Sequence, residues 1–323
     1  MFLEHVNLNL PIEKSNEAWD FFISILGCQE DQRPKQMGKE MRLLWADCGL
    51  QQFHLPLVHA STTDIAPQRL RGYTTLAFKS RTSLQAALNR IRCNPSIKVI
   101  EIDEDDGVPV AVRIQCPFGG VYRLVATERS QLFLGGDEDS PGHPMIPHPS
   151  LSEEETVVGI QRLNLFAPQK SLESIASFWK NSLHCDDVEI VAGNVVVQLN
   201  DSQQIIFEAR DDIEDYDGHH LCLYIPKYEE AYRACEKLGI IYDPGRFADR
   251  GGSWMLAQEH KQFRVLHWPM IASAGYAHLG ILQQLRNYRN YEEPSYTLEL
   301  EIRSLEHPSY PCNLRILAKN KAV

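Results

Sequence analysis

The sequence predicts an α+β protein built from four similar units, each a strand, a helix and then three further strands. Two observations carry this prediction. The second half of the chain repeats a pattern of the first half 157 positions later. Each half also repeats a pattern within itself. Repetition of this kind is typical of a chain made of duplicated supersecondary units.

The long-range repeat aligns the two halves without gaps. In each copy an alternating apolar segment is followed by a polar turn and an amphipathic helix, and in the first copy Trp19, Phe22 and Leu26 recur at helical spacing. The residues shared by the two copies are Asn7, Leu8, Pro11, Phe21, Leu26 and Cys28, which match Asn164, Leu165, Pro168, Phe178, Leu183 and Cys185.

The shorter repeat lies within each half. A predicted strand over 70–78, with Gly72 near its start, precedes a predicted helix over 83–91. A strand over 216–225, with Gly218 in the same place, precedes a helix over 228–238. Apolar alternation predicts the remaining strands. They fall at 41–45, 52–55, 108–114, 121–125, 195–199 and 204–207.

These repeats predict an N-terminal domain over 1–134 and a C-terminal domain over 157–323. The segment 135–156 is rich in Gly, Pro, Ser and acidic residues, which indicates a solvated linker; His143 and His148 within it offer at most a loose metal site. Residues 244–294 look like an irregular insertion in the fourth unit. His260 and His267 lie in this segment. Its length is the only observation that suggests a lid over the site.

Composition excludes several functional classes. The chain has 32 basic and 43 acidic residues, a net charge of −11, and no basic run, so we expect no nucleic-acid partner. It has no apolar run long enough for a membrane span, and the polar residues among its first ten positions lead us to expect no secretory leader. The eight scattered cysteines indicate reduced thiols. We therefore expect a cytoplasmic monomer or homodimer, or a stromal one if a transit peptide has been removed.

Several short motifs resemble one family. Glu4–Leu8 and Cys116–Leu124 look like the strand opening and the strand ending of the vicinal oxygen chelate superfamily, which includes glyoxalase I, extradiol dioxygenases and antibiotic-resistance proteins. Gln52–Pro56, Asp217–His220 and Glu299–Ser304 are similar to a two-domain branch of it. The resemblance covers nearly the whole chain. It implies two fused domains of βαβββ modules, with mixed curved sheets that form a cleft.

The resemblance also implies metal ligands at the start of the first strand and inside the last strand of each unit. Unit one has His5 and His54 at these places, and unit four has His219 and a carboxylate, Glu299 or Glu301. In fused members a site forms between units one and four. The predicted ligands are therefore His5, His54, His219 and Glu299. Such a set suits Fe(II), Mn(II), Ni(II) or Zn(II).

Strand alternation leaves two choices open in the fourth unit. His219 and His220 point to opposite faces, and the alignment of Gly218 with Gly72 selects His219. Glu299 and Glu301 point to the same face, and both are candidate catalytic groups. Glu299 lies nearer the strand start and is the preferred ligand. Glu301 is a second ligand, a general base or one half of an ion pair.

The inner units carry other residues in the ligand positions, namely Tyr73, Arg123 and Arg162. One interpretation is a second cleft that binds a carboxylate or phosphate group. The preferred one is a buried salt bridge with a neighbour such as Glu208, with Tyr73 filling the vacated space. His307 follows the last strand and is a further candidate substrate contact.

Two functional classes follow. The leading hypothesis is a divalent-metal-dependent enzyme that acts on a small molecule with vicinal oxygens, by lyase, isomerase or oxygenase chemistry. Arg162 stands where extradiol dioxygenases have a histidine, and His54 stands where glyoxalases have a carboxylate, so neither activity transfers directly. The alternative is a protein without turnover that binds or sequesters a small molecule, like the resistance members.

Overall fold

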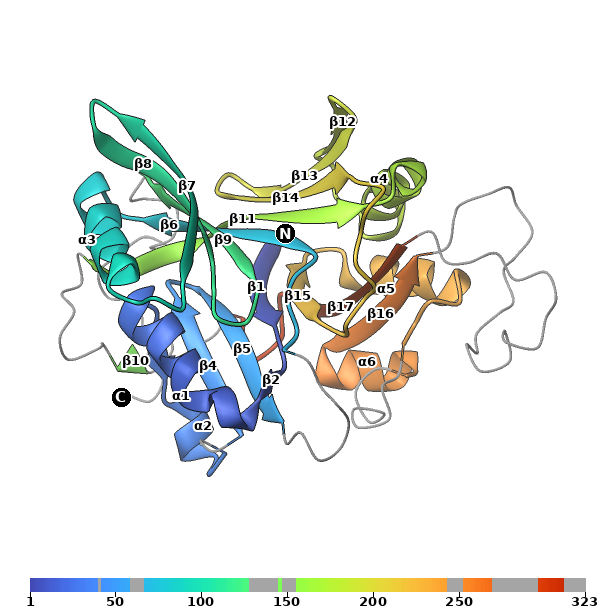
Figure 1. Cartoon of the computed structure of the whole chain (residues 1–323). Coiled ribbons are helices and arrows are strands. Elements are labelled where there is room, and N and C mark those ends of the chain that lie inside the picture. Colours follow the sequence, from blue (N-terminus) through green and yellow to red (C-terminus); the bar gives the residue numbers. More distant parts are fainter. Residues whose placement is uncertain are drawn as a thin grey trace. The chain divides into compact units, whose positions relative to one another are not determined.

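The computed structural model describes residues 1–39, 42–58, 67–127, 145–146, 155–242, 252–268 and 296–310 (Figure 1). They form helices and mixed β-sheets, which confirms the predicted α+β class. The chain divides into two compact units. The N-terminal unit is mainly Glu4–Asn164, and the C-terminal unit is mainly Leu165–Asn200 and Gln204–Tyr310.

The first module of the N-terminal unit is a mixed sheet with short helices. Its strands lie in the order β10–β3–β4–β5–β1, with β1 parallel to β5 and β4 antiparallel to β5. Helix α1 continues as a π-helical segment over Asp20–Ile25. The elements are β1 (Phe2–Asn7), β2 (Leu10–Pro11), a 3-10 turn (Ile12–Lys14), α1 (Ser15–Trp19), β3 (Gln29–Asp31), α2 (Arg33–Gln36), β4 (Leu43–Cys48), β5 (Gln51–Val58) and β10 (Met145–Ile146).

The two faces of this sheet differ in polarity because side chains alternate along each strand. Val6 and Phe53 are paired in register on one face, and Phe53 packs against Phe22 of the helical segment with ring centroids 5.0 Å apart. The opposite face carries His5 and Gln52, which are also paired in register. The apolar face forms core, and the polar face carries the predicted ligands.

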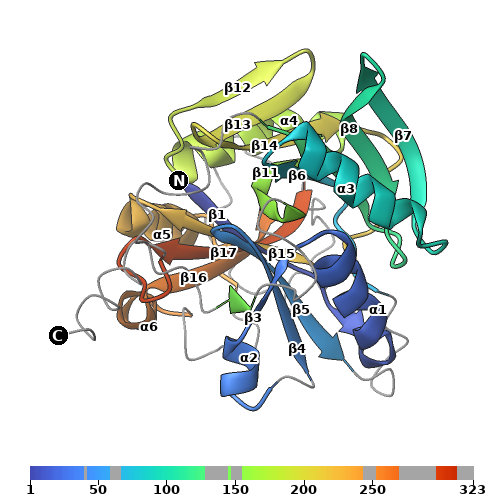
Figure 2. The same cartoon turned by 90° about the vertical axis from the view of Figure 1, so that its left-hand side faces the viewer.

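The second module of the N-terminal unit contains β6 (Gly72–Phe78), α3 (Arg81–Arg92), β7 (Lys98–Asp105), β8 (Val108–Gln115) and β9 (Val121–Ala126), with strand order β6–β9–β8–β7. Helix α3 begins at an N-cap, where the Ser80 hydroxyl accepts from the Ser83 backbone N–H at 3.1 Å. The helix packs against β8 and β9 (Figure 2). Asp106 and Gly107, both at positive φ, close the β7–β8 hairpin.

The C-terminal unit repeats this plan. Its helix α4 also changes to a π-helical segment, over Phe178–Ser182, at the same place in the repeat as in the first module. The strand orders are β12–β13–β14 and β15–β17–β16. The elements are β11 (Val157–Ala167, which begins in the N-terminal unit), a 3-10 turn (Gln169–Ser171), α4 (Leu172–Ser177), β12 (Val188–Val191), β13 (Asn194–Asn200), β14 (Gln203–Ala209), β15 (His220–Ile225), α5 (Tyr228–Lys237), α6 (Trp254–His260), β16 (Gln262–Trp268) and β17 (Tyr296–Ser304).

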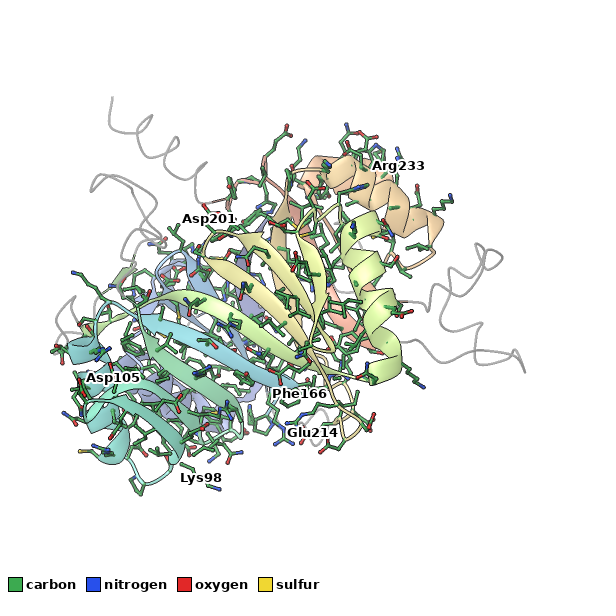
Figure 3. The ribbon with its side chains drawn as sticks, turned by 90° about the horizontal axis from the view of Figure 1, so that it is seen from above. Lys98, Asp105, Phe166, Asp201, Glu214 and Arg233 are labelled. Atoms are coloured by element: carbon green, nitrogen blue, oxygen red, sulfur yellow. The ribbon has the colours of Figure 1, made fainter. Side chains whose placement is uncertain are left out.

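Helix α5 shows how this unit separates core from surface. Tyr228 and Tyr232 are buried and lie against Phe263 of β16, with ring centroids 5.3 and 5.2 Å away. Arg233 lies on the outer side of the helix, where it pairs with acidic neighbours four residues before it and three after it (Figure 3). The 3.6-residue period predicted over 228–238 is confirmed.

The expected insertion over 244–294 is partly wrong. Helix α6 and strand β16 lie inside it, and β16 pairs antiparallel with β17. Phe263 and Val265 are buried, so 262–268 is a regular strand of the fourth module. Residues 243–251 and 269–295 lie outside the described residues, as do most of the predicted linker, including His143 and His148. No helix in the described part of the chain is long and apolar enough to cross a membrane.

Candidate metal site in the N-terminal unit

Two predicted ligands meet on the polar face of the first module. In the parallel pairing of β1 with β5, His5 lies beside Gln52 and Asn7 beside His54. The rings of His5 and His54 stack with centroids 3.7 Å apart and planes 21° apart. Trp45 of β4 stacks on His54 in turn, at 4.5 Å and 12°. The imidazoles therefore lie within a close, nearly parallel stack of rings.

A carboxylate completes a group of three side chains that could hold a metal ion. Glu4 and His5 are each only 1% exposed, and the Glu4 carboxylate accepts a hydrogen bond from His5 Nδ1. One donor atom each from Glu4, His5 and His54 lie within 4.8 Å of one another. Because a carboxylate accepts, His5 Nδ1 carries a proton, and in the neutral imidazole Nε2 then carries the lone pair. Two imidazoles with a buried carboxylate are a donor set that fits a divalent transition metal.

Sequence analysis missed Glu4. It is adjacent to His5, and strict alternation on a strand places adjacent side chains on opposite faces. The signal available in the sequence was an acidic residue beside a predicted ligand at the start of a strand. A long Glu side chain has enough rotatable bonds to turn back toward its neighbour's ring.

A buried polar network supports His54. Gln52 Oε1 lies 2.9 Å from His54 Nε2 and also accepts from Arg33 Nη2 at 2.9 Å. Gln52 Nε2 donates to Asp31 at 2.8 Å and to Asp47. Burial, and after it the nearby Asp31 carboxylate, raises the pKa of Asp47 well above its ordinary value. The network brings together acidic, basic and amide groups. Gln52, Asp31 and Asp47 are buried, and the Arg33 side chain is 23% exposed.

The predicted ligands of the fourth module lie in the C-terminal unit. His219 is fully buried, and its Nδ1 lies 2.7 Å from the Asp217 carboxylate, which also accepts from its backbone N–H at 3.1 Å. Its neighbour His220 opens β15, where it lies in register with Glu299, and its Nε2 lies 3.7 Å from Glu301. It is therefore His220, the histidine not selected from the sequence, that approaches a predicted carboxylate.

The two candidate carboxylates are held by arginines. Arg264 of β16 binds Glu299 through Nη1 and Glu301 through Nη2. Arg303 binds the other oxygen of Glu301, with Nη2 at 2.6 Å and Nε at 2.7 Å. Burial lowers the pKa of Arg264, but the two carboxylates more than offset burial and leave that pKa raised. We name these four residues the arginine–carboxylate cluster. Of the three roles that the sequence left open for Glu301, the cluster matches that of an ion-pair partner. A carboxylate that guanidinium groups already bind is a poor metal ligand.

The predicted substrate contacts have other surroundings. Arg123 is about a third exposed and pairs with Asp103 at 3.3 Å, so the expected buried salt bridge is instead an exposed ion pair with a different partner. Tyr73 lies under the Arg113 guanidinium, 5.2 Å from the ring centre. Arg162 lies in β11. His307 lies in the turn after β17, where its Nδ1 accepts from the Ser309 backbone N–H at 3.1 Å.

Comparison with known proteins identifies the fold. No protein-family model matches the sequence, and no curated protein matches it. A solved structure described as a putative dioxygenase from Bacillus subtilis is similar over 94% of this chain and 85% of its own, with 12% identity and a TM-score of 0.54. Glyoxalase I from Zea mays matches over 97% and 95%, with 10% identity and a TM-score of 0.48. The similarity to the Bacillus subtilis structure over nearly the whole of this chain supports the predicted α+β fold. Fold alone does not assign a reaction.

Proposed function

We propose that the protein is a divalent-metal-dependent enzyme that acts on a small molecule with vicinal oxygens. The observation that carries the proposal is the group of Glu4, His5 and His54, in which Glu4 and His5 are buried and His54 is half-buried. A buried imidazole next to a buried carboxylate, as in His5 and Glu4, is costly to desolvate, and ligation of a cation is one role that offsets this cost. His5 and His54 are the residues that would hold the ion.

The residues around the imidazoles have distinct tasks. When bound, the ion supplies Lewis acidity to neighbouring substrate oxygens, which suits lyase, isomerase or oxygenase chemistry. Glu4 fixes the orientation of His5 through Nδ1. Trp45 stacks on His54, covering that ring from water. Iron, manganese, nickel and zinc all accept such donors.

His219, Glu299 and Glu301 have a smaller part in this proposal than the sequence predicted. Glu299 is bound by Arg264, so recruitment as a ligand or base requires that ion pair to open. A carboxylate beside a guanidinium is also a weaker base, because the cation stabilises its charged form. His219 remains a proposed third imidazole, and its contribution is measured separately below.

Metal analysis of the purified protein tests the proposal. We expect the metal-free protein to bind about one equivalent of Fe(II), Mn(II), Ni(II) or Zn(II), measured by elemental analysis after reloading and desalting. His5→Ala and His54→Ala should each lose the ion. His260→Ala, at the end of α6, is the matched control and should retain it. His219→Ala measures whether that residue contributes.

The outcomes separate the two functional classes. A wild-type protein that resists loading with all four metals contradicts the enzyme proposal and favours the alternative of a binding or sequestering protein. Full occupancy in both His5→Ala and His54→Ala shows that the ion is held elsewhere. Loss in His219→Ala as complete as in His5→Ala supports the four-ligand set predicted from the sequence.

A further inference from the structure

We propose that Gln52 is a positioning residue that fixes the tautomer of His54, so that His54 presents Nδ1 rather than Nε2 to the metal. This inference rests on the proposed function for its metal, but its structural part concerns the metal-free protein. It assigns a role to a buried side chain that touches a proposed ligand without being one. Gln52 is 0% exposed.

The orientation of the Gln52 amide follows from its neighbours. Its nitrogen faces two carboxylates, Asp31 at 2.8 Å and Asp47. Its oxygen faces the guanidinium of Arg33 at 2.9 Å. A flipped amide would place the carbonyl oxygen against two acidic groups and the NH₂ against a cation, losing three hydrogen bonds. The contacts therefore determine which end is oxygen.

The tautomer of His54 follows from that orientation. Gln52 Oε1 can only accept, and His54 Nε2 lies 2.9 Å from it, so Nε2 must carry the proton. In a neutral imidazole the other nitrogen then carries the lone pair. For His54 this is Nδ1, whereas for His5 the bond to Glu4 leaves the lone pair on Nε2. The two imidazoles thus carry their lone pairs on different nitrogens, Nε2 of His5 and Nδ1 of His54.

The network is built to hold this arrangement. Arg33 donates to the Asp31 carboxylate from Nε at 2.6 Å and from its backbone N–H at 2.7 Å, which fixes the guanidinium. The same guanidinium lies 4.7 Å from the centre of the Trp45 ring, which stacks on His54. Gln52 is therefore held at both ends of its amide, and His54 is held by Gln52 and by Trp45. Rotation of the imidazole would break contacts with both.

Nuclear magnetic resonance of the metal-free protein tests the tautomer directly. Histidine labelled with ¹⁵N, observed by long-range ¹H–¹⁵N correlation at about pH 8, shows which ring nitrogen is protonated, because an ordinary imidazole is neutral there. His54→Gln assigns the signals by their loss. We expect a protonated Nε2 and an unprotonated Nδ1 for His54. A protonated Nδ1 overturns the inference.

A pair of matched variants tests the consequence for metal binding. Gln52→Met removes the acceptor at similar volume, and we expect mixed tautomers at His54 with Zn(II) affinity, measured by chelator competition, about 10- to 100-fold lower. Gln51→Met changes the neighbouring buried glutamine, whose Oε1 accepts from the Ile160 backbone N–H, and should leave both unchanged. An unchanged tautomer and affinity in Gln52→Met overturn the role of Gln52.

The two proposals fail in different ways. If the wild type shows the expected tautomer but binds none of the four metals, the proposed function is wrong and the tautomer assignment stands. If it binds metal at His5 and His54 with Nδ1 of His54 protonated, the function stands and the assignment is wrong. Should Gln52→Met fail to fold by circular dichroism, the spectrum of the wild type still decides the tautomer.

Discussion

The first and fourth modules place different chemistry on equivalent strands. In both, the opening strand runs parallel to a later strand of the module, with His5 beside Gln52 in one and His220 beside Glu299 in the other. In the first module these positions hold an imidazole and an amide. In the fourth they hold an imidazole and a carboxylate, Glu299, that Arg264 binds. One scaffold thus supports either a ligand face or an ion-pair face.

The difference lies in which groups are left able to bind a cation. In the arginine–carboxylate cluster two guanidinium groups oppose two carboxylates, so the cluster has no net charge. In the first module Arg33 is engaged by Asp31 and Gln52. Its charge therefore supports the network behind His54 instead of neutralising Glu4. The two modules therefore differ in what their arginines bind. Arg264 binds the candidate carboxylates themselves, whereas Arg33 binds Asp31 and Gln52.

Replacing Arg264 should produce the largest effect on stability. Arg264→Met leaves Glu299, whose side chain is 12% exposed, and one oxygen of the buried Glu301 without their cation. We expect the free energy of unfolding to fall by about 3–5 kcal/mol. Chemical denaturation followed by circular dichroism measures this change. Arg233→Met, on the outer side of α5, is the control and should change it by at most about 0.5 kcal/mol.

A second substitution sharpens this test. Adding Glu299→Gln to Arg264→Met removes one uncompensated charge, so the double variant should be more stable than the single one. A loss below about 1 kcal/mol for Arg264→Met would mean that the cluster does not depend on its central arginine. The contrast drawn between the two modules would then be wrong.

Asp47 provides the next test, on the side of the first module. Burial and the charges of Asp31 and Glu4 raise its pKa in the folded state above the ordinary 3.8, against the opposing effect of Gln52 and Arg33. The folded state therefore holds this proton to higher pH than the unfolded state. As pH rises from the ordinary pKa toward the raised one, the free energy of unfolding falls.

Asp47→Asn should remove this fall in the free energy of unfolding with rising pH. The Asn side chain still has a carbonyl oxygen that can accept from Gln52. We expect the variant to exceed the wild type by about 1–2 kcal/mol at neutral pH, with the difference shrinking toward pH 4. Unfolding curves between pH 4 and 8 measure it. Asp31→Asn, which removes the counter-charge of Arg33, should be less stable than the wild type at neutral pH. A pH-independent difference for Asp47→Asn would contradict this account.

The fold could be predicted from the sequence because each internal repeat corresponds to one module of strands and a helix. The sequence also predicted that His5 and His54 lie together, because the family resemblance implies ligands at the start of the first strand and inside the last strand of one unit. It missed Arg264 because that residue lies in a segment that looked like an insertion, although 262–268 pairs with β17. A cation that arrives from a distant strand has no signature in local periodicity. The sequence alone could not show that Glu299 binds an arginine, because the pairing of β16 with β17 brings Arg264 to it.

Replacing Arg123, in the second module, should have the smallest effect on the free energy of unfolding. Its guanidinium lies 3.3 Å from Asp103, and both side chains are about a third to a half exposed. Water screens such a pair, so Arg123→Ala should lower the free energy of unfolding by at most about 1 kcal/mol. A loss as large as that of Arg264→Met would show that Arg123 is buried and paired, as the sequence first suggested. If the unfolding curves of Arg123→Ala and Asp103→Ala both equal that of the wild type, this exposed ion pair contributes nothing measurable to stability, in contrast to the cluster in the fourth module.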